Sequence, residues 1–480
     1  MKLIYFIWSL IERFGTNFVS LGGNIILSYL LMPEDFGLVA MLGVFTSMIF
    51  VFIDCGLSDG LLTLGTPDRR DFNTVFFFNV TVGILLFVIY CAISPAVARY
   101  FGKPVLQPMM SIIGAGAIFN GLSLSQMTRL RVERQFKRLA IFNVSAITLA
   151  LTIAIVMALN GLRYWALVEL QVGFAGFFWL MLALFSKWEL RWEFDVARFK
   201  SLWAFGVNLL FSTVVGQVAQ NIFAFVIGKH INSVQAGYMG QAQKLQQTPN
   251  NSLESAISVT AYVLIAQKET AEQKRDAFVE MFGVITFINS TFCFLLLALS
   301  YPLIDFVFPA KWLPVIPYFR LMLCWGLVYP ICNFMMIIFK LFGRTSVIRN
   351  VYFIEKILIV ISAFLLYPLG INVMLLAAIM LSVLTFLLFS FFASRTTGIS
   401  VLTYVKIFTS HALMLAAVAA VAYGVTLLTL PLGSVVAVVA AIIVFVALLL
   451  AEMRLLRPMY YSFVLSRVKS VLVKEGSNAV

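Results

Sequence analysis

The chain has 480 residues, of which 62% are hydrophobic and only 11% are charged, and its formal net charge is +13 at pH 7. A soluble protein of this length needs more polar residues to cover its core, so the composition excludes a soluble globular protein. Long continuous apolar runs also exclude a transmembrane β-barrel, whose strands would show short segments of alternating hydrophobicity.

Apolar runs of about 20 residues recur from one end of the chain to the other, and each is long enough to cross a hydrocarbon layer of about 30 Å. We predict about fourteen transmembrane helices, at 12–32, 36–62, 74–101, 105–127, 139–160, 164–186, 201–228, 235–265, 278–308, 315–339, 351–369, 372–394, 408–430 and 434–451. The longest connection, 187–200, is too short to hold a soluble catalytic domain.

Lys and Arg residues concentrate in the connections that follow even-numbered spans and at the two ends of the chain. That side holds 25 of the 34 basic residues, whereas the opposite side holds five. Basic loops remain in the cytoplasm, so we predict that both termini are cytoplasmic. This distribution explains the positive charge without a nucleic-acid partner, and the basic tail is expected to rest on the anionic inner leaflet.

Short segments recur in the same order in two parts of the chain. The matched pairs are 14–17 with 205–208, 36–38 with 236–238, 92–95 with 298–302, and Lys103 with Lys311. Because six spans separate the two copies, both enter the membrane in the same direction, which is typical of parallel transporter repeats. We predict an all-α integral membrane fold with two parallel six-helix repeats. The predicted parts are an N-terminal lobe (1–200), a C-terminal lobe (201–400), and two extra helices with a basic cytoplasmic tail (401–480).

Polar side chains form stripes on the first two spans of each predicted repeat. Each of the two longest stripes covers about 80° of its helix, at about 100° per residue. The stripe of span one contains Arg13, Asn17, Ser20, Asn24 and Ser28. The stripe of span eight contains Lys244, Gln247, Asn251, Glu254 and Ser258. Spans two and seven add Ser47, Asp54 and Ser58, and Thr213, Gln217, Gln220 and Asn221. A charge at the bilayer centre costs about 2.5 to 3.5 kcal/mol, so the stripes predict a wet cavity.

Structural roles compete with this interpretation for some of these residues. Ser and Asn often bond only to neighbouring helices, and Arg13 lies near enough to the cytoplasmic end to reach lipid headgroups. Lys356 beside Glu355, and Asp305 near the outer interface, are expected to lie at the membrane interface. Lys244 and Glu254 lie in the middle of span eight, and a cavity explains them best.

The sequence contains no motif that indicates catalysis or metal binding. There is no Ser, His and Asp grouping, no paired carboxylates and no phosphate-binding Gly-rich loop. The two histidines, His230 and His411, are far apart, and all five cysteines fall within apolar runs. We therefore expect a secondary transporter that is not an enzyme and that holds neither a metal nor a cofactor.

Four segments of the chain resemble a known family. They are 31–41 (LMPEDFGLVAM), 54–58 (DCGLS), 71–76 (DFNTVF) and 136–140 (FKRLA). They are similar to segments of bacterial polysaccharide flippases of the Wzx type, and the likeness runs in order over essentially the whole chain. The resemblance is strongest to the branch that handles exopolysaccharide, colanic-acid-like or teichuronic-acid-like repeat units.

The resemblance implies membership of the multidrug/oligosaccharidyl-lipid/polysaccharide (MOP) exporter superfamily, whose members have two six-helix lobes around a central cavity. It implies that the substrate is an undecaprenyl-pyrophosphate-linked oligosaccharide, moved by alternating access from the inner to the outer leaflet of the bacterial cytoplasmic membrane. It also implies a polysaccharide polymerase and chain-length machinery as partners. The candidate cavity residues are Arg13, Asn17, Asn24, Asp54, Gln217, Asn221, Lys244, Gln247, Asn251, Glu254 and Arg320. Candidates for coupling to a proton or sodium gradient are Asp54, Glu169 and Glu254.

Three alternatives remain open from the sequence. A multidrug exporter or a peptidoglycan-precursor exporter of the same superfamily would have the same architecture. A membrane-embedded polysaccharide polymerase or ligase normally needs a sizeable outer loop, and every predicted outer loop here is short. A structural or assembly role would leave the charged stripes without a purpose.

Overall fold

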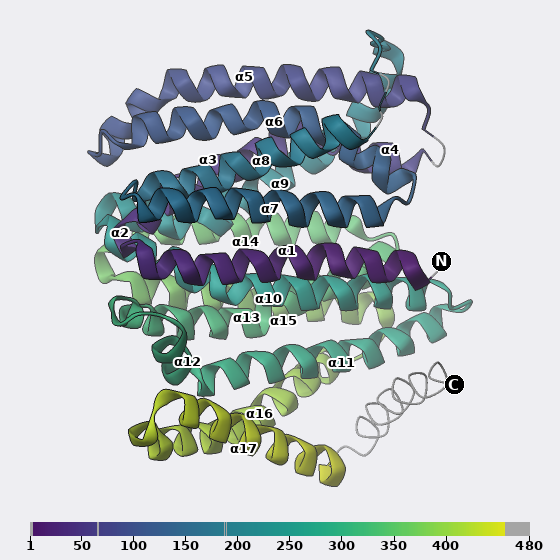
Figure 1. The fold of residues 1–480 in the computed structure, drawn as a ribbon. Helices are drawn as coiled ribbons and strands as arrows, with labels where there is room; N and C mark the ends of the chain where they lie inside the picture. Colours follow the sequence, from purple (N-terminus) through teal and green to yellow (C-terminus); the bar gives the residue numbers. More distant parts are fainter. Residues whose placement is uncertain (1–2, 65–66, 187, 189, 457–480) are drawn as a thin grey trace, which may run out of the picture. The chain divides into compact units, whose positions relative to one another are not determined.

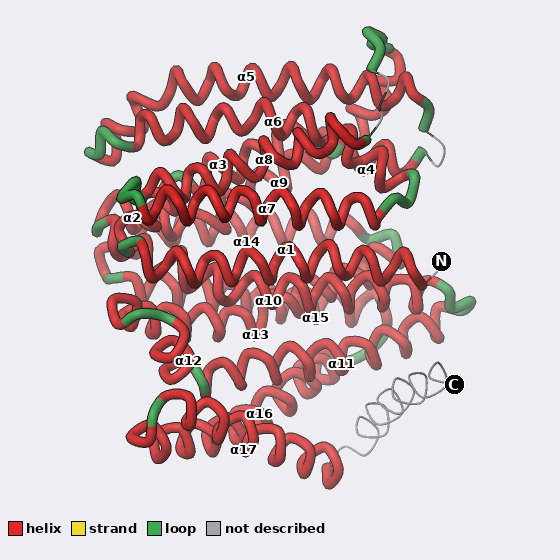
Figure 2. Tube along the Cα trace, in the orientation of Figure 1, coloured by secondary structure: helices red, strands yellow, loops and turns green. Residues whose placement is uncertain are grey.

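The computed structural model describes residues 3–64, 67–186, 188 and 190–456. In this part of the chain every regular element is a helix, and short loops join the helices (Figure 1; Figure 2). The α-helices are α1 (Leu3–Leu30), α2 (Pro33–Met41), α3 (Gly43–Asp54), α4 (Leu57–Thr63), α5 (Arg69–Phe101), α6 (Leu106–Val132), α7 (Phe136–Leu159), α8 (Tyr164–Phe185), α9 (Val196–His230), α10 (Ser233–Ala266), α11 (Ala271–Ala298), α12 (Ser300–Val307), α13 (Ile316–Leu341), α14 (Thr345–Leu366), α15 (Ile371–Thr397), α16 (Val401–Thr429) and α17 (Ser434–Leu456). Three short 3₁₀ helices span Ala310–Val315, Tyr367–Leu369 and Leu430–Leu432. The predicted basic tail, 457–480, lies outside the described residues.

Local sequence signals fix many of the helix ends. Asp68 caps α5 by accepting a hydrogen bond from the Asp71 backbone nitrogen, and Thr270 caps α11 in the same way. Gly102 ends α5 in the left-handed conformation, which glycine adopts without steric cost.

Helices occupy all of the predicted spans, but some of these helices are less apolar than a typical membrane-spanning helix. Eleven segments within the described residues are long and apolar enough to cross a membrane. The three predicted spans outside this set are those that correspond to α1, α9 and α10. These helices have 28, 35 and 34 residues, so their length suffices, but they carry three of the predicted polar walls. The count of fourteen therefore stays a prediction.

The second predicted span, 36–62, is not one helix but three. It is divided into α2, α3 and α4, and the break between α3 and α4 falls at Cys55 and Gly56, which have φ values of 43° and 73°. Gly56 approaches Gly206 of α9 so closely that a Cβ on Gly56 would lie 2.9 Å from the Gly206 Cα. Asn79 of α5, with its amide nitrogen facing acceptors, donates to the Ile53 backbone oxygen at 2.9 Å, beside the break.

The chain divides into two compact units, which are described separately. The first unit contains residues 1–248 and 349–381, and the second contains 249–348 and 382–480. The unit boundary at 248–249 lies within α10, immediately before Pro249. The predicted lobes, divided at residues 200 and 400, describe an internal repeat and remain a prediction.

In the first unit, α5 packs along α6, α7 along α8, and α1 along α7 (Figure 1). One apolar cluster joins α1, α7 and α8 through Leu27, Ala154 and Ala166, each fully buried. A second cluster joins α4, α5 and α9 through Leu61, Val75 and neighbouring side chains. These contacts hold α1, α2, α8 and the first half of α10 within one unit.

In the second unit, α11 packs against α13 and α16, and α16 packs against α17. Phe278 of α11 stacks on Phe334 of α13, with ring centroids 5.4 Å apart. Leu415 of α16 and Phe445 of α17 are buried in a common apolar cluster with residues of α11. This unit therefore has an apolar core of its own.

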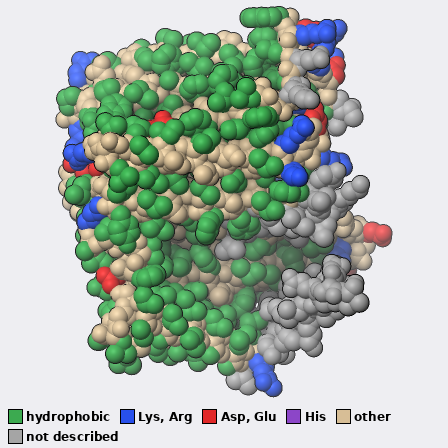
Figure 3. All heavy atoms as spheres, viewed as in Figure 1, with side chains coloured by type: hydrophobic (Ala, Val, Ile, Leu, Met, Phe, Trp, Pro, Cys, Tyr) green, Lys and Arg blue, Asp and Glu red, His purple; other side chains and the backbone are tan. Residues whose placement is uncertain are grey.

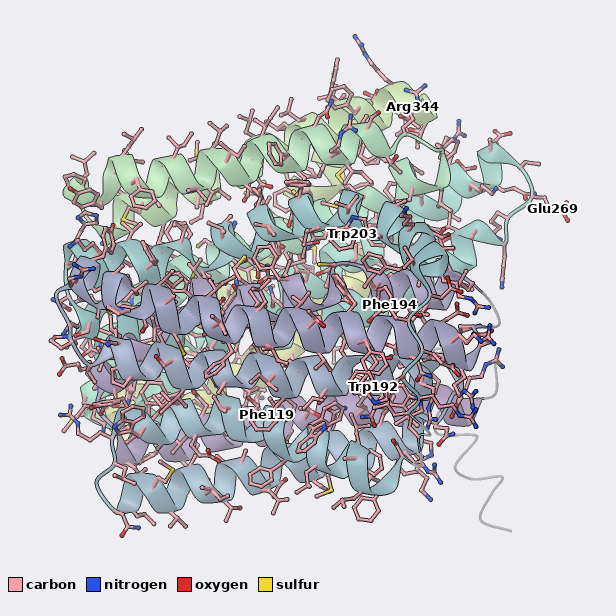
Figure 4. All side chains as sticks on the ribbon, turned by 90° about the horizontal axis from the view of Figure 1, so that it is seen from above. Phe119, Trp192, Phe194, Trp203, Glu269 and Arg344 are labelled. Atoms are coloured by element: carbon pink, nitrogen blue, oxygen red, sulfur yellow. The ribbon has the colours of Figure 1, made fainter. Side chains whose placement is uncertain are left out.

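The surface has the polarity expected of a membrane protein. Figure 3 shows hydrophobic side chains over the sides of the helices, with most of the charged side chains gathered at the helix ends. In the first unit, Trp192, Phe194 and Trp203 lie toward one end of the helices, around the start of α9 (Figure 4). Aromatic side chains of this kind are enriched at membrane–water interfaces. In the second unit, Glu269 and Arg344 lie at exposed turns between helices (Figure 4).

Candidate functional site

The structure brings together one residue from each of the two longest predicted stripes. Lys244 of α10 donates a hydrogen bond from Nζ to Oδ1 of Asn24 in α1, at 3.0 Å. Asn24 is buried, with 2% of its surface exposed, and Lys244 is half-buried. A half-buried ammonium on a membrane helix is costly unless it has polar company, which Asn24 supplies.

Lys244 and Asn24 line a cavity of about 190 Å³ inside the first unit. Its walls come from four helices, α1, α2, α8 and α10. The lining residues are Asn24, Phe36, Val39, Ala40, Leu167, Leu170, Gln171, Gly237, Gly240, Gln241 and Lys244. The cavity thus combines an apolar wall with four polar side chains, an arrangement typical of ligand sites.

Two of the polar lining residues, Gln171 and Gln241, were not among the sequence-predicted candidates. Gln241 precedes Lys244 by three residues, so it lies on the same helix face and extends the predicted stripe by one turn. That spacing was a usable signal. Gln171 is isolated in the apolar sequence of α8, and nothing in its spacing distinguished it.

Other candidates lie on the same helices but away from this cavity. Asn221 of α9 donates from Nδ2 to Ser47 Oγ of α3 at 3.3 Å, so the polar walls of spans two and seven meet there. Asn17, Gln217 and Gln247 are half-buried and are not among the cavity-lining residues. The side chains of Arg13 and Asn251 lie outside the described part of the structure.

The charged candidates Asp54, Glu169, Glu254 and Arg320 do not line the Lys244 cavity. Asp54, the last residue of α3, accepts a hydrogen bond from the Ser58 backbone nitrogen in the first turn of α4, at 3.1 Å. Glu169 of α8 is half-buried and does not line the cavity. In the second unit, Glu254 accepts a hydrogen bond from Asn333, and Arg320 donates to Ser300 Oγ at 2.7 Å.

The expectation of an interfacial position was wrong for Lys356 and Glu355, whereas Asp305 is exposed near the end of α12. The side chains of Lys356 and Glu355 are buried near the middle of α14, with 1% and 5% of their surface exposed, instead of lying at the interface. They form an ion pair of 3.1 Å between Lys356 Nζ and Glu355 Oε2, and the ammonium lies 4.8 Å from the Tyr352 ring centroid. Mutual neutralisation and the aromatic ring compensate for the burial of the charges.

At the predicted outer end of the first unit, α2 and α10 touch through glycines. A Cβ on Gly37 would lie 1.7 Å from the Ser233 backbone oxygen, and a Cβ on Gly237 would lie 2.0 Å from the Pro33 backbone oxygen. Only glycine allows two backbones to approach this closely. Since Gly237 also lines the cavity, this crossing forms part of its wall.

At the predicted cytoplasmic end, Arg198 near the start of α9 joins three carboxylates. Its Nη1 lies 2.6 Å from Asp68 Oδ1 and 2.9 Å from Asp71 Oδ1, and its Nε lies 3.3 Å from Asp195 Oδ2. The hydrogen bond from Arg198 lowers the pKa of Asp68 below its usual value. The cluster ties the start of α5 to the start of α9.

No metal centre is apparent in the described residues, where no three His, Cys, Asp or Glu side chains lie close enough to share an ion. Free cysteines occur at five positions of this part of the chain. The chemistry that the site offers is therefore binding, through one ammonium and three amide groups beside an apolar wall.

A family model described as "Polysaccharide biosynthesis protein" matches residues 26–317. The teichuronic acid biosynthesis protein TuaB of Bacillus subtilis is 22% identical over 303 residues, which cover 59% of this chain and 59% of that protein. The succinoglycan biosynthesis transport protein ExoT of Rhizobium meliloti is 22% identical over 340 residues, 68% of this chain and 67% of that protein. The lipopolysaccharide biosynthesis protein WzxC of Escherichia coli is 21% identical over 315 residues, 64% and 63%. The matches thus span about three-fifths to two-thirds of these relatives.

Two solved structures share the fold. The lipid II flippase MurJ, in an inward closed conformation, superimposes with a TM-score of 0.71 and 14% identity, covering 94% of this chain and 99% of MurJ. An inward-facing multidrug resistance MATE family transporter of the MOP superfamily gives a TM-score of 0.60 and 14% identity, covering 84% and 95%. At such identities the likeness concerns the fold alone. Because the family match extends over more than half of the sequence, the chain belongs to the polysaccharide biosynthesis protein family, and it shares its helical membrane fold with MurJ and the MATE transporter.

Proposed function

We propose that this protein flips undecaprenyl-pyrophosphate-linked oligosaccharide repeat units from the inner to the outer leaflet of the bacterial cytoplasmic membrane. It works by alternating access, with both termini in the cytoplasm, and supplies the synthesis of a surface polysaccharide. The names of the relatives support this proposal, because they concern teichuronic acid, succinoglycan and lipopolysaccharide. The fold of the lipid II flippase MurJ supports the mode of action.

The observation that carries the proposal is the position of Lys244. Its ammonium lies at the wall of a cavity, within a helix of 34 residues, and it donates a hydrogen bond to the neutral amide of Asn24. No salt bridge of Lys244 occurs among the described residues, so the positive charge is available to an anionic ligand. A diphosphate meets this need, and a lysine follows a moving phosphate as a point charge on a flexible stem.

A multidrug exporter or a peptidoglycan-precursor exporter is the second candidate. The fold favours neither over the first, since MATE transporters and MurJ share it. The polysaccharide family match and the names of the relatives favour a polysaccharide repeat unit. A polymerase or ligase would instead need groups that attack a glycosidic or phosphate bond, and binding groups make up the cavity wall described above.

Energy for transport comes, in this proposal, from a proton or sodium gradient. Asp54, Glu169 and Glu254 are the proposed coupling residues, and the protein needs no cofactor. A polysaccharide polymerase and its chain-length machinery are the proposed partners in the same membrane, because they consume the flipped unit.

Replacing Lys244 tests the proposal. Lys244→Ala is expected to abolish or strongly reduce surface polymer at a normal protein level, and lipid-linked units should accumulate in the inner leaflet. Lys244→Arg should retain part of the export, because it keeps the charge. The matched control is Lys340→Ala, which removes an exposed lysine at the end of α13 and should leave export unchanged. Parental export by a well-expressed Lys244→Ala protein would show that Lys244 is structural.

A further inference from the structure

Three buried amide atoms at the wall of the Lys244 cavity have no hydrogen-bond partner among the residues that the structure describes. They are Asn24 Nδ2 of α1, Gln171 Oε1 of α8 and Gln241 Nε2 of α10. Their side chains all line the same cavity of about 190 Å³. Native proteins seldom bury a polar atom without a partner, so three such atoms around one cavity point to a polar occupant.

The chemistry of the three atoms limits what the occupant is. Asn24 Oδ1 already accepts from Lys244, which fixes the amide of Asn24 and leaves its Nδ2 as a donor toward the cavity. Gln241 offers a second donor, and Gln171 offers an acceptor. A phosphate or carboxylate group has only acceptor oxygens, so it would satisfy Gln171 only if that amide turned its nitrogen toward the cavity. Hydroxyl groups both donate and accept, and they satisfy the whole set in either orientation of the Gln171 amide.

The apolar part of the wall fits a sugar ring. Phe36 and Val39 of α2 and Leu167 and Leu170 of α8 line the same cavity as the three amides. A pyranose ring has apolar C–H faces that pack on such side chains, while its equatorial hydroxyls project toward amides. The cavity volume of about 190 Å³ is comparable to that of a single hexose, so one sugar ring fills it.

We propose that this cavity is a subsite for one sugar, the residue linked directly to the diphosphate of the lipid carrier. Asn24, Gln171 and Gln241 hydrogen-bond its hydroxyl groups, and the adjacent ammonium of Lys244 meets the diphosphate. The inference rests on the proposed function and adds to it a site that reads the first sugar. Selectivity among repeat units then depends on the three amide side chains as well as on the positive charge of Lys244.

The test measures how purified full-length protein in nanodiscs binds two kinds of probe. One is polyprenyl diphosphate, and the other is the same lipid carrying glucose, galactose or N-acetylglucosamine. The parental protein should bind at least one sugar-bearing probe about tenfold more tightly than the bare diphosphate, the gain that one or two hydrogen bonds provide. Gln171→Leu and Gln241→Leu should lose this gain and keep the affinity for the bare lipid.

The matched control is Gln243→Leu on the same helix. Gln243 donates to the Gln220 backbone oxygen at 2.8 Å and does not line the cavity, so its replacement should leave the tenfold preference intact. Thermal stability gives a second readout, in which the two leucine variants are expected to change the melting temperature in opposite directions. Gln241→Leu removes an unpartnered buried amide and should keep or raise the stability of the empty protein, whereas Gln243→Leu breaks a bond and should lower it.

The possible failures are distinguishable. If the parental protein binds no polyprenyl diphosphate at all, the proposed function is wrong and the subsite falls with it. If it binds the bare lipid and prefers none of the three sugars, the cavity holds only water and the flippase proposal stands. If the leucine variants keep the preference for a sugar, the sugar binds elsewhere and the subsite is refuted.

Discussion

Replacing Gly237 with alanine is expected to force α2 and α10 apart. The new Cβ would lie 2.0 Å from the Pro33 backbone oxygen, whereas an ordinary contact needs 3.4 Å, so the backbones must separate by roughly 1.4 Å. The obstacle is a backbone atom, which cannot rotate away as a side chain can. Overpacking of this kind costs about 1 to 3 kcal/mol, and the better helix propensity of alanine returns about 0.5 to 1 kcal/mol.

The assay is the temperature at which half of the detergent-solubilised protein loses its monodisperse form. Gly22→Ala in α1 is the matched control, because a Cβ there meets nothing within 4 Å and should leave stability equal or slightly higher. Gly237→Ala should melt clearly below both the parental protein and this control. Gly37→Ala should behave similarly, and the double variant should cost less than the sum, since one separation relieves both clashes. Equal melting of Gly237→Ala and Gly22→Ala would refute the close helix crossing.

Three further predictions concern topology, coupling and pH. Reporter fusions should report outside after Phe101, Gly161 and Ala310, and inside after Arg138, Lys200 and Val480; a tail that reports outside would remove one of the appended spans. If Asp54 or Glu254 carries a coupling proton, Asp54→Asn or Glu254→Gln should still bind substrate but lose gradient-driven transport, and unaltered transport across a pH range would exclude that residue. Because Arg198 lowers the pKa of Asp68, their contact stabilises the fold above the unfolded pKa of Asp68 and is lost as the pH falls through its lower folded pKa. The melting difference between parental protein and Arg198→Met should therefore shrink on acidification, and a difference that grows would contradict this reading.

Helix positions were predictable because length and apolarity alone define them in a membrane. The phase of each polar stripe was also predictable, since it depends only on the helical period. Which residues of two stripes meet was not, because that depends on the axial offset between helices. Asn24 and Lys244 were both candidates, and only the structure shows that they touch.

Other features depend on backbone geometry or on tertiary neighbours, and they could not be predicted from the sequence. The break of the second span depends on a left-handed Cys55, a conformation that no sequence rule assigns to cysteine. Gln171 is a candidate ligand-binding residue only because α1, α2 and α10 form a cavity beside it. Lys356 was misplaced because its adjacent partner and Tyr352 make burial tolerable, an effect that requires knowledge of side-chain directions.

The broken second span has a consequence for how the protein is made. A membrane helix whose backbone bonds are all internal can leave the translocon alone, whereas one with an interrupted ladder exposes polar groups to lipid. Beside the interruption between α3 and α4, the amide of Asn79 in α5 donates to the Ile53 backbone oxygen. The second span thus becomes fully compatible with lipid only once α5 has emerged beside it. These two segments should enter the bilayer as a pair, and the variant Asn79→Leu should leave the second span, with Cys55 at its break, more accessible to a cysteine reagent than in the parental protein.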